Sequence, residues 1–393
     1  MLAYQWYRGS NAIPGATTSQ YELGVADLDK VVTVRVTGTA AGYEPLSRTG
    51  RQFFGTSIGQ FTAPAGLALS DSPMVGTPLQ LLGGQFTPSP TSTAYQWSVG
   101  GASIQGATQA SYTPVPADIG KKVEVRITAS RAGLETTETT VTTAGAVAPG
   151  TLYSLGPPVI TGTGRVGAAL TTSIGTWSPA PTAPQVQWYR DGAPISGAVG
   201  AAYTPAAADV GSSVSVVVTA TRAGYSSATS ASSAVIILPG VVTVIAPPTI
   251  SGSPVVGSTL VATAGSWSPA ATNVTFQWYL SGSPVAGATG STFGVAPTYV
   301  DSTVSVMVTA HRAGYDDGTS TRTFSSSVTG RVYATCAALN ADYPHGVMRP
   351  NAMDLRSGTY HSPYAGTFIS QSLYNLNAAG RDADKDGIAC EKP

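Results

Sequence analysis

The amino-acid sequence predicts a mostly β protein in which small β-sandwiches follow one another and a module of a different kind comes last. Three observations predict this class: two markers recur at a fixed period, valine-rich segments alternate in character, and the composition changes after Gly330. Gly (45) and Pro (28) are frequent, whereas charged residues make up only 10% of the 393 residues. Such a composition suits many short strands joined by turns.

Two sequence markers recur in phase along the chain. The dipeptide Gln-Trp occurs at steps of 91, 91 and 90 residues, at 5–6, 96–97, 187–188 and 277–278. Ala-Gly followed by Tyr or Leu occurs at the same steps, at 41–43, 132–134, 223–225 and 313–315. Two independent markers that keep one period over four copies indicate four repeats of one structural unit.

The third copy shows the strand plan of this unit. Val214, Val216 and Val218 lie at every second position, which predicts a half-buried strand. About seven short strands within roughly 85 residues, with a tryptophan in the third strand, are the signature of an immunoglobulin-like sandwich. Trp188 would then lie between the two sheets. We therefore expect tandem immunoglobulin-like β-sandwiches.

The period sets the expected domain limits. We expect immunoglobulin-like repeats at 1–61, 62–147, 156–238 and 246–329, followed by a terminal module at 331–393. Proline-rich segments join them and restrict the backbone. The first repeat lacks the residues that would form its first strands. We therefore expect the natural chain to begin upstream of Met1, where further repeats and an export signal would lie.

Several function classes are disfavoured by the sequence. The formal net charge is zero, so neither nucleic acid nor an anionic membrane surface is indicated as a partner, and no apolar run is long enough to span a membrane. "GTGRVG" at 162–167 fits a dinucleotide fingerprint, but the threonine-rich stretch after it predicts no helix. His311, His345 and His361 stand in no pattern typical of nucleophilic catalysis. We expect a non-enzymatic protein, and a monomer.

The two cysteines, Cys336 and Cys390, both lie in the terminal module. An isolated pair in one small segment is typical of one disulfide in an oxidising compartment. Two buried free thiols in a cytosolic protein are the alternative. Two short helices are expected in the same module, at 336–341 and at 367–379, the second closed by a glycine.

The acidic segment near the C-terminus has the spacing of a calcium loop. Asp382, Asp384 and Asp386 alternate, a glycine follows, and the carbonyl of Ile388 adds another oxygen. This is the first half of an EF-hand-type loop. The second half differs, because position 12 is not acidic and the nearest acid is Glu391 at position 10. From 382 to 391 four acids and one base give a charge of −3. A metal site and a solvated acidic terminus both remain open on spacing alone.

Two family resemblances add to this reading. The repeats look like the immunoglobulin-like repeats of surface proteins from Gram-positive bacteria, especially actinobacteria. The terminal module resembles the Excalibur family of extracellular calcium-binding modules. The matching residues are Tyr333, Cys336, "YPHGV" at 343–347, Tyr374, Asn377 and "DADKDGIACE" at 382–391. All fixed positions of the family pattern Asp-x-Asp-x-Asp-Gly-x-x-Cys-Glu are present.

The Excalibur resemblance implies both a disulfide and a ligand set. The disulfide would join Cys336 to Cys390. Calcium would be held by Asp382, Asp384, Asp386, the carbonyl of Ile388 and Glu391. The resemblance also implies an extracellular or cell-surface location.

We therefore expect a secreted or wall-associated bacterial protein. Its repeats would serve as a spacer or in adhesion, and its partners would be calcium and a cell-wall polymer or surface protein. One alternative is the accessory region of a larger secreted enzyme such as a nuclease. The other is a decoration protein of a phage virion.

Overall fold

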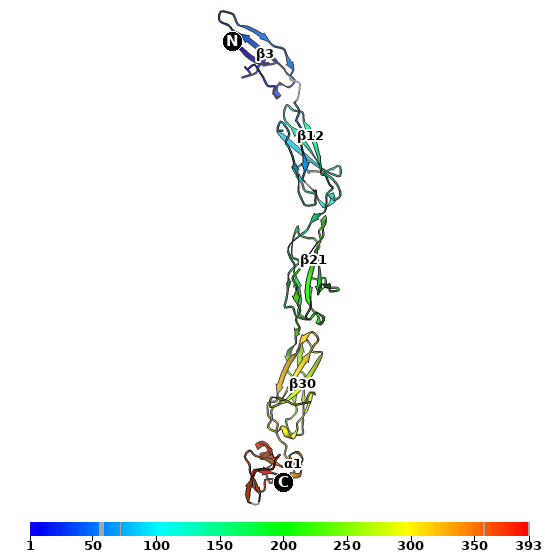
Figure 1. Cartoon of the computed structure of the whole chain (residues 1–393), viewed down its shortest axis with the longest axis vertical. Coiled ribbons are helices and arrows are strands. Elements are labelled where there is room, and N and C mark those ends of the chain that lie inside the picture. The colour runs from blue at the N-terminus through cyan, green and yellow to red at the C-terminus, as the bar shows by residue number, and fades with distance from the viewer. Residues whose placement is uncertain (55–58, 71, 357, 392–393) are drawn as a thin grey trace. The chain divides into compact units, whose positions relative to one another are not determined.

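The structure is a computed structural model that describes residues 1–393 except 55–58, 71, 357 and 392–393 (Figure 1). The chain divides into two compact units. The first comprises Met1–Pro157, Ile174–Gln185 and Val218–Ser230, and the second comprises Pro158–Ser173, Val186–Val217 and Ala231–Pro393. The third repeat contributes residues to both units, so the expected domain limits stay a prediction.

The first repeat forms a single sheet in its described part, with strand order β2-β1-β3-β4 and β5 paired to β3. Its elements are β1 (Leu2–Arg8), β2 (Asn11–Ala12), the 3-10 turn η1 (Val25–Asp27), β3 (Val31–Gly38), β4 (Leu46–Thr49) and β5 (Phe53–Phe54). Trp6 is only partly buried there, as expected where one sheet is described rather than two.

The second repeat has two sheets, with orders β10-β7-β6 and β12-β11-β8-β9. Its elements are β6 (Ala68–Leu69), β7 (Leu79–Leu82), β8 (Ser92–Val99), β9 (Ala102–Ser103), β10 (Ser111–Tyr112), η2 (Pro116–Asp118), β11 (Val123–Ser130) and β12 (Thr137–Thr142). All pairs in these sheets are antiparallel, which is typical of a β-sandwich.

The third repeat and the link before it carry twelve strands and one 3-10 turn. These are β13 (Gly150–Thr151), β14 (Tyr153–Gly156), β15 (Ile160–Thr161), β16 (Leu170–Thr172), β17 (Thr176–Ser178), β18 (Gln185–Arg190), β19 (Ala193–Pro194), β20 (Ala202–Tyr203), η3 (Ala207–Asp209), β21 (Ser213–Ala220), β22 (Tyr225–Ser226), β23 (Ala228–Ala231) and β24 (Val235–Ile236). In the second unit, one sheet has the order β15-β16-β20, and β24 pairs with β21.

The fourth repeat follows the same plan, with sheets β27-β28-β32 and β31-β30-β33-β35. Its elements, with the link before it, are β25 (Gly240–Val241), β26 (Thr243–Ala246), β27 (Ile250–Ser251), β28 (Thr259–Ala262), β29 (Ser266–Ser268), β30 (Asn273–Leu280), β31 (Ser283–Pro284), β32 (Thr292–Gly294), η4 (Pro297–Tyr299), β33 (Val304–His311), β34 (Tyr315–Asp316) and β35 (Gly318–Thr323).

The second, third and fourth repeats each have a core of the same kind. Trp97, Trp188 and Trp278 are fully buried, and each indole N–H donates to a backbone carbonyl twelve residues further on, at 2.8, 2.9 and 2.9 Å. Strands β21 and β33 alternate buried and partly buried residues without exception. The expected mostly β fold of tandem immunoglobulin-like repeats is therefore confirmed.

A buried aspartate closes the corner of the first three repeats. In the third repeat, the Asp209 carboxylate accepts from the Tyr203 hydroxyl at 2.6 Å, from the Ala206 amide at 2.7 Å and from Arg190. Asp27 and Asp118 accept from a tyrosine six residues earlier in the same way. The fourth repeat has Phe293 and Tyr299 at these two positions instead, with their rings stacked 5.6 Å apart.

We expect Asp209→Ala to destabilise the third repeat by about 3 kcal/mol, because it leaves the partly buried Tyr203 hydroxyl and the Arg190 guanidinium without their partner. The melting temperature of that repeat should fall by more than ~10 °C. Calorimetry of the full chain measures this, and Tyr203→Phe, which removes one hydroxyl only, should have a smaller effect. Equal effects of the two variants would contradict the assigned role of the carboxylate.

The same corner makes stability depend on pH. Burial alone would raise the pKa of Asp209, but the hydrogen bonds from Tyr203, Ala206 and Arg190 outweigh it and lower that pKa. The folded-state pKa therefore lies below the unfolded value, near 3.9. The stabilisation is complete above the unfolded pKa and is lost as the pH falls through the folded pKa. We expect the melting temperature of the Asp209→Ala variant to depend less steeply on pH below ~5 than that of the wild-type chain.

Consecutive repeats are joined through the Ala-Gly-Tyr/Leu marker. Gly150 pairs in parallel with Tyr225, and Gly240 pairs in parallel with Tyr315. A Cβ placed on either glycine would overlap the ring of its tyrosine partner. Each ring also covers a second glycine. We call each such pair of glycines a glycine slot: Gly76 with Gly150 at Tyr225, and Gly167 with Gly240 at Tyr315.

We expect Gly240→Val to disturb the joint between the third and fourth repeats, because its side chain would occupy the volume of the Tyr315 ring. Overpacking of this kind costs about 1–3 kcal/mol. Limited proteolysis of the full chain should show faster cleavage at 238–248 than in the wild type. Gly294→Ala is the matched control, because a Cβ there has no heavy atom within 4 Å among the described residues. Unchanged cleavage in Gly240→Val would contradict the joint.

The terminal module contains two helices and five short strands in its described part. These are α1 (Cys336–Asp342), β36 (Val347–Met348), β37 (Asp354–Arg356), β38 (Thr359–His361), β39 (Phe368–Ile369), α2 (Gln371–Asn377) and β40 (Ile388–Ala389). Leu373 of α2 lies at Gly330, where a Cβ would overlap it. Leu373 therefore lies at Gly330 as Tyr225 lies at Gly150 and Tyr315 at Gly240.

Candidate metal centre

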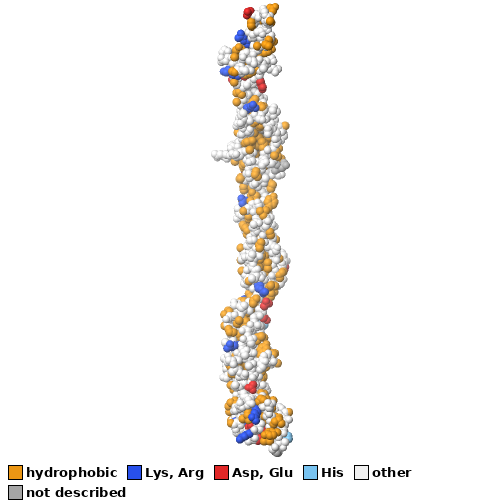
Figure 2. Space-filling view, turned by 90° about the vertical axis from the view of Figure 1, so that its left-hand side faces the viewer, with side chains coloured by type: hydrophobic (Ala, Val, Ile, Leu, Met, Phe, Trp, Pro, Cys, Tyr) orange, Lys and Arg blue, Asp and Glu red, His pale blue; other side chains and the backbone are white. Residues whose placement is uncertain are grey.

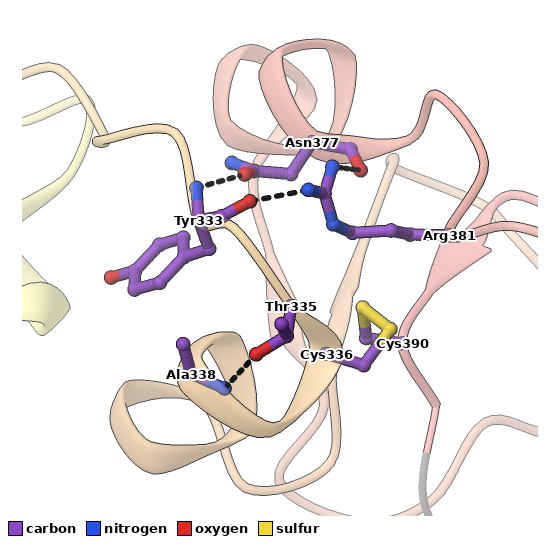
Figure 3. Close-up of a disulfide and its surroundings, with 7 residues drawn as sticks. All are labelled: Tyr333, Thr335, Cys336, Ala338, Asn377, Arg381 and Cys390. Atoms are coloured by element: carbon purple, nitrogen blue, oxygen red, sulfur yellow. Dashed lines mark hydrogen bonds between the residues drawn. A yellow bond between two sulfur atoms is a disulfide. The ribbon is translucent and has the colours of Figure 1, made fainter.

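A disulfide closes the terminal module. Cys336, the first residue of α1, is bonded to Cys390 at a sequence separation of 54 (Figure 3). The expected pairing is therefore confirmed. The helix begins here because the Thr335 hydroxyl caps it by accepting from the Ala338 amide at 3.1 Å.

Polar contacts attach the start of the acidic segment to the start of the module. The Asn377 side chain accepts from the Tyr333 amide at 2.9 Å and donates to the Arg331 carbonyl at 3.1 Å. Arg381 donates to the carbonyls of Tyr333 and Asn377 (Figure 3). Residue 381 and Cys390 are thus both held against the segment that enters α1, so the intervening loop is fixed at its two ends.

Helix α2 is shorter than the sequence predicted. It spans Gln371–Asn377, after the capping hydroxyl of Ser370. The sequence predicted that Phe368 and Ile369 lie in the first turn of this helix. They instead form β39, which pairs in parallel with β36. The other edge of β36 pairs with β40. This small sheet brings the end of the acidic segment beside residues 347–349.

The acidic loop brings together the three carboxylates expected from its spacing. Asp382, Asp384 and Asp386 can each offer one oxygen such that these atoms all lie within 4.8 Å of one another. Two residues in this loop have positive φ, Lys385 at 62° and Gly387 at 99°. A Cβ at residue 387 would also overlap Arg349. The tight turn therefore requires glycine at that position.

Hydrogen bonds orient two of these carboxylates. Asp382 accepts through Oδ2 from the Tyr374 hydroxyl at 2.5 Å and from the Gly387 amide at 3.2 Å. Asp386 accepts from the Leu355 and Ile388 amides, both at 2.8 Å. Within the described residues, the buried Oδ1 of Asp382 has no hydrogen-bond partner. A buried carboxylate oxygen without a partner is costly unless a cation or water meets it.

The backbone geometry at Ile388 leaves its carbonyl oxygen available for the expected role as a calcium ligand. Met348 and Ile388 are opposite each other in the antiparallel pair, and the Arg349 amide donates to the Gly387 carbonyl at 3.1 Å. In such a pair the residue between two hydrogen-bonded positions turns its N–H and C=O away from the partner strand. The N–H of Ile388 accordingly bonds to Asp386. Its carbonyl is not used by β36.

A second acidic group includes a residue that sequence reasoning missed. Asp354, Asp386 and Glu391 also place one oxygen each within 4.8 Å of one another. Asp354 begins β37, 28 residues before the acidic loop, and it belongs to no local spacing pattern. Glu391, expected as a ligand of the loop, thus lies with Asp354 and Asp386. Asp386 belongs to both groups.

Burial and, after it, the neighbouring carboxylates disfavour the charged forms of Glu391 and Asp386. Burial, followed by the charges of Asp386, Asp354 and Asp384, raises the pKa of Glu391 to about 7. Burial also raises the pKa of Asp386, with smaller effects of Asp384 and Asp382 in the same direction. Both pKa shifts reflect partial burial together with nearby negative charge. A bound cation would relieve this repulsion, so the donor set fits a hard divalent ion such as calcium.

Comparisons with known proteins yield matches among solved structures. No family model and no curated protein matches the chain. The chain is similar to immunoglobulin domains 1–4 of Sidekick-1, at 16% identity and a TM-score of 0.21, over 84% of this chain and 90% of that chain. It is also similar to a Ca²⁺-stabilized adhesin that helps an Antarctic bacterium bind ice, at 15% identity and a TM-score of 0.27, over 84% and 90%.

A third match is to three N-terminal domains of the outer capsid protein Hoc of bacteriophage RB49. Identity is 14% and the TM-score 0.24, over 66% of this chain and 97% of that chain. At these identities a likeness concerns the fold alone. Within the described ranges, none of the helices is long and apolar enough to cross a membrane.

Proposed function

We propose that this is a non-enzymatic bacterial protein of the cell surface or the secreted space, whose terminal module binds calcium. The repeats would act as a spacer or in adhesion. The observation that carries the proposal is the acidic loop: three carboxylates converge there, and one of them has a buried oxygen without a partner among the described residues. Charged side chains are few on the face shown in Figure 2, which is consistent with the low charged fraction.

The loop offers the ligands that calcium prefers. Calcium takes six to eight oxygens at about 2.3–2.6 Å, and it accepts carboxylates, carbonyls and water together. Asp382, Asp384 and Asp386 would supply carboxylates, and Ile388 would supply its carbonyl. A bound ion would neutralise part of the negative charge and order the loop. The fixed ends at residue 381 and Cys390 reduce the conformational entropy lost on binding.

The disulfide supports the proposed location. Disulfides persist in oxidising surroundings and are rare in the cytosol of mesophiles. Extracellular calcium modules bind with dissociation constants of about 10⁻⁴–10⁻³ M, so an ion outside the cell would fill such a site. A cell-wall polymer or a surface protein would then be the macromolecular partner.

Calorimetric titration of the oxidised full chain with calcium chloride tests this proposal. Binding with a dissociation constant of about 10⁻⁴–10⁻³ M is expected. Asp384→Ala should weaken binding, because it removes one of the proposed ligands. Asp384 is exposed, so the substitution should leave the fold intact. Asp317→Asn, in the fourth repeat, is the matched control and should bind as the wild type does. No heat from the wild-type chain up to several times this concentration would overturn the proposal.

A further inference from the structure

We propose that the terminal module has a second cation site, formed by the carboxylates of Asp354, Asp386 and Glu391. It lies beside the acidic loop and shares Asp386 with it. The inference rests on the proposed function only through this shared residue. The remaining ligands belong to different parts of the chain, namely β37 and the segment after the disulfide.

Asp354 is the residue that distinguishes this site from an acidic surface patch. Its side chain is only 1% exposed. Arg356 holds one of its oxygens, Oδ2, through a hydrogen bond from Nε at 2.5 Å and through an ion pair. The other oxygen, Oδ1, is buried and has no hydrogen-bond partner in the described part of the chain. Such an oxygen is costly to bury unless something positive or hydrogen-bonding meets it.

Glu391 presents a second oxygen of the same kind. Its Oε2 is buried and also lacks a hydrogen-bond partner among the described residues. Cys390, the preceding residue, is fixed by the disulfide. The three carboxylates place their ligand atoms within 4.8 Å of one another. Two oxygens about 2.4 Å from a single calcium ion can be at most about twice that distance apart, so this spacing fits one ion.

Two ion positions account for the arrangement of the five carboxylates better than one does. Asp382 and Asp384 group with Asp386, and so do Asp354 and Glu391, but these are separate groups. Asp386 has two carboxylate oxygens and can serve both ions as a bridge. Charge points the same way: the five carboxylates, together with Arg356 and Lys385, carry −3. One divalent cation would leave part of this negative charge unneutralised.

The all-oxygen donor set selects the kind of ion. Carboxylates without thiolate or imidazole favour hard cations, and calcium tolerates irregular geometry better than magnesium does. The second ion would link the β37–β38 hairpin to the C-terminal segment. The Leu355 amide of β37 already donates to Asp386, so this hairpin is in contact with the acidic loop. We therefore assign calcium to the second position as well.

Counting bound calcium in the oxidised full chain tests the second site, by native mass spectrometry together with calorimetric titration. We expect two ions in the wild type, one in Asp354→Asn and one in Asp384→Asn. Glu391→Gln should behave as Asp354→Asn does. This second variant, with circular dichroism in chelator, keeps the test valid if Asp354→Asn does not fold. Asp317→Asn should bind two ions.

The outcomes separate the two proposals. The second site would be overturned if the wild type bound a single ion and both Asp354→Asn and Asp384→Asn weakened the binding of that ion. Asp354 would then be a ligand of one shared ion. A single ion unaffected by Asp354→Asn and Glu391→Gln would overturn it as well. If Asp354→Asn loses an ion while Asp384→Asn loses none, the second site stands and the proposed loop site fails. No bound calcium in the wild type would overturn both.

Discussion

Asp386→Asn is expected to remove calcium binding at both positions, with a loss of affinity on the order of a hundredfold or more. Asp386 is the one carboxylate common to the two acidic groups. Asparagine has nearly the same volume and keeps one acceptor oxygen, so the effect reports the lost charge more than a lost contact. Calorimetric titration of the full chain with calcium chloride measures the change.

The controls for this variant come from the same cluster. Asp384→Asn and Asp354→Asn should each remove one ion only, so Asp386→Asn should be more severe than either. Asp386 also accepts from the Leu355 and Ile388 amides, so the melting temperature in chelator must be compared with that of the wild type. A folded Asp386→Asn variant with wild-type affinity would contradict the assigned role of this residue.

The double substitution Cys336→Ser with Cys390→Ser is expected to unfold the terminal module or leave it marginally stable. A disulfide that closes a loop of this length contributes about 4 kcal/mol in the chain-entropy model, and a module of this size has little other margin. Calcium binding should be weakened or lost with it, because residue 390 and the adjacent Glu391 are no longer tied to α1. Calorimetry and limited proteolysis measure these two effects.

The repeats are the internal control for the disulfide. Both cysteines of the chain lie in the terminal module, so the unfolding transitions of the first three repeats should not change. Reduction of the wild-type chain should reproduce the effect of the double variant. Wild-type calcium affinity in the double variant would show that the loop is ordered without its covalent closure.

The repeat fold could be predicted because its signals are local and periodic. Val214, Val216 and Val218 alternate with the other face of their strand, and the tryptophans recur at fixed steps, so burial follows from spacing alone. The loop at 382–388 could be predicted for the same reason. The disulfide followed from a resemblance at the cysteines rather than from their distance in the sequence.

The remaining features depend on contacts between distant residues. Asp354 stands alone in the sequence, and only the β37–β38 hairpin places it beside Asp386 and Glu391. Likewise, Phe368 and Ile369 have a helix-compatible pattern, but their pairing with β36 draws them into a strand. The hydrogen bonds that close the corner in the first three repeats could not be predicted, because Tyr203 precedes Asp209 by six residues and neither residue type indicates the other.

The glycine slots allow the number of repeats to change. Tyr225 and Tyr315 each enter a slot in the repeat before, and the third repeat carries both a partner of this kind and a slot of its own. A duplication or deletion of one whole unit in the gene would therefore create no new kind of joint. Leu373 takes the place against Gly330 that the tyrosine rings take against Gly150 and Gly240, so the terminal module can follow a last repeat whatever the number of units before it. Evolution can then vary the length of such a protein separately from the acidic module at its end.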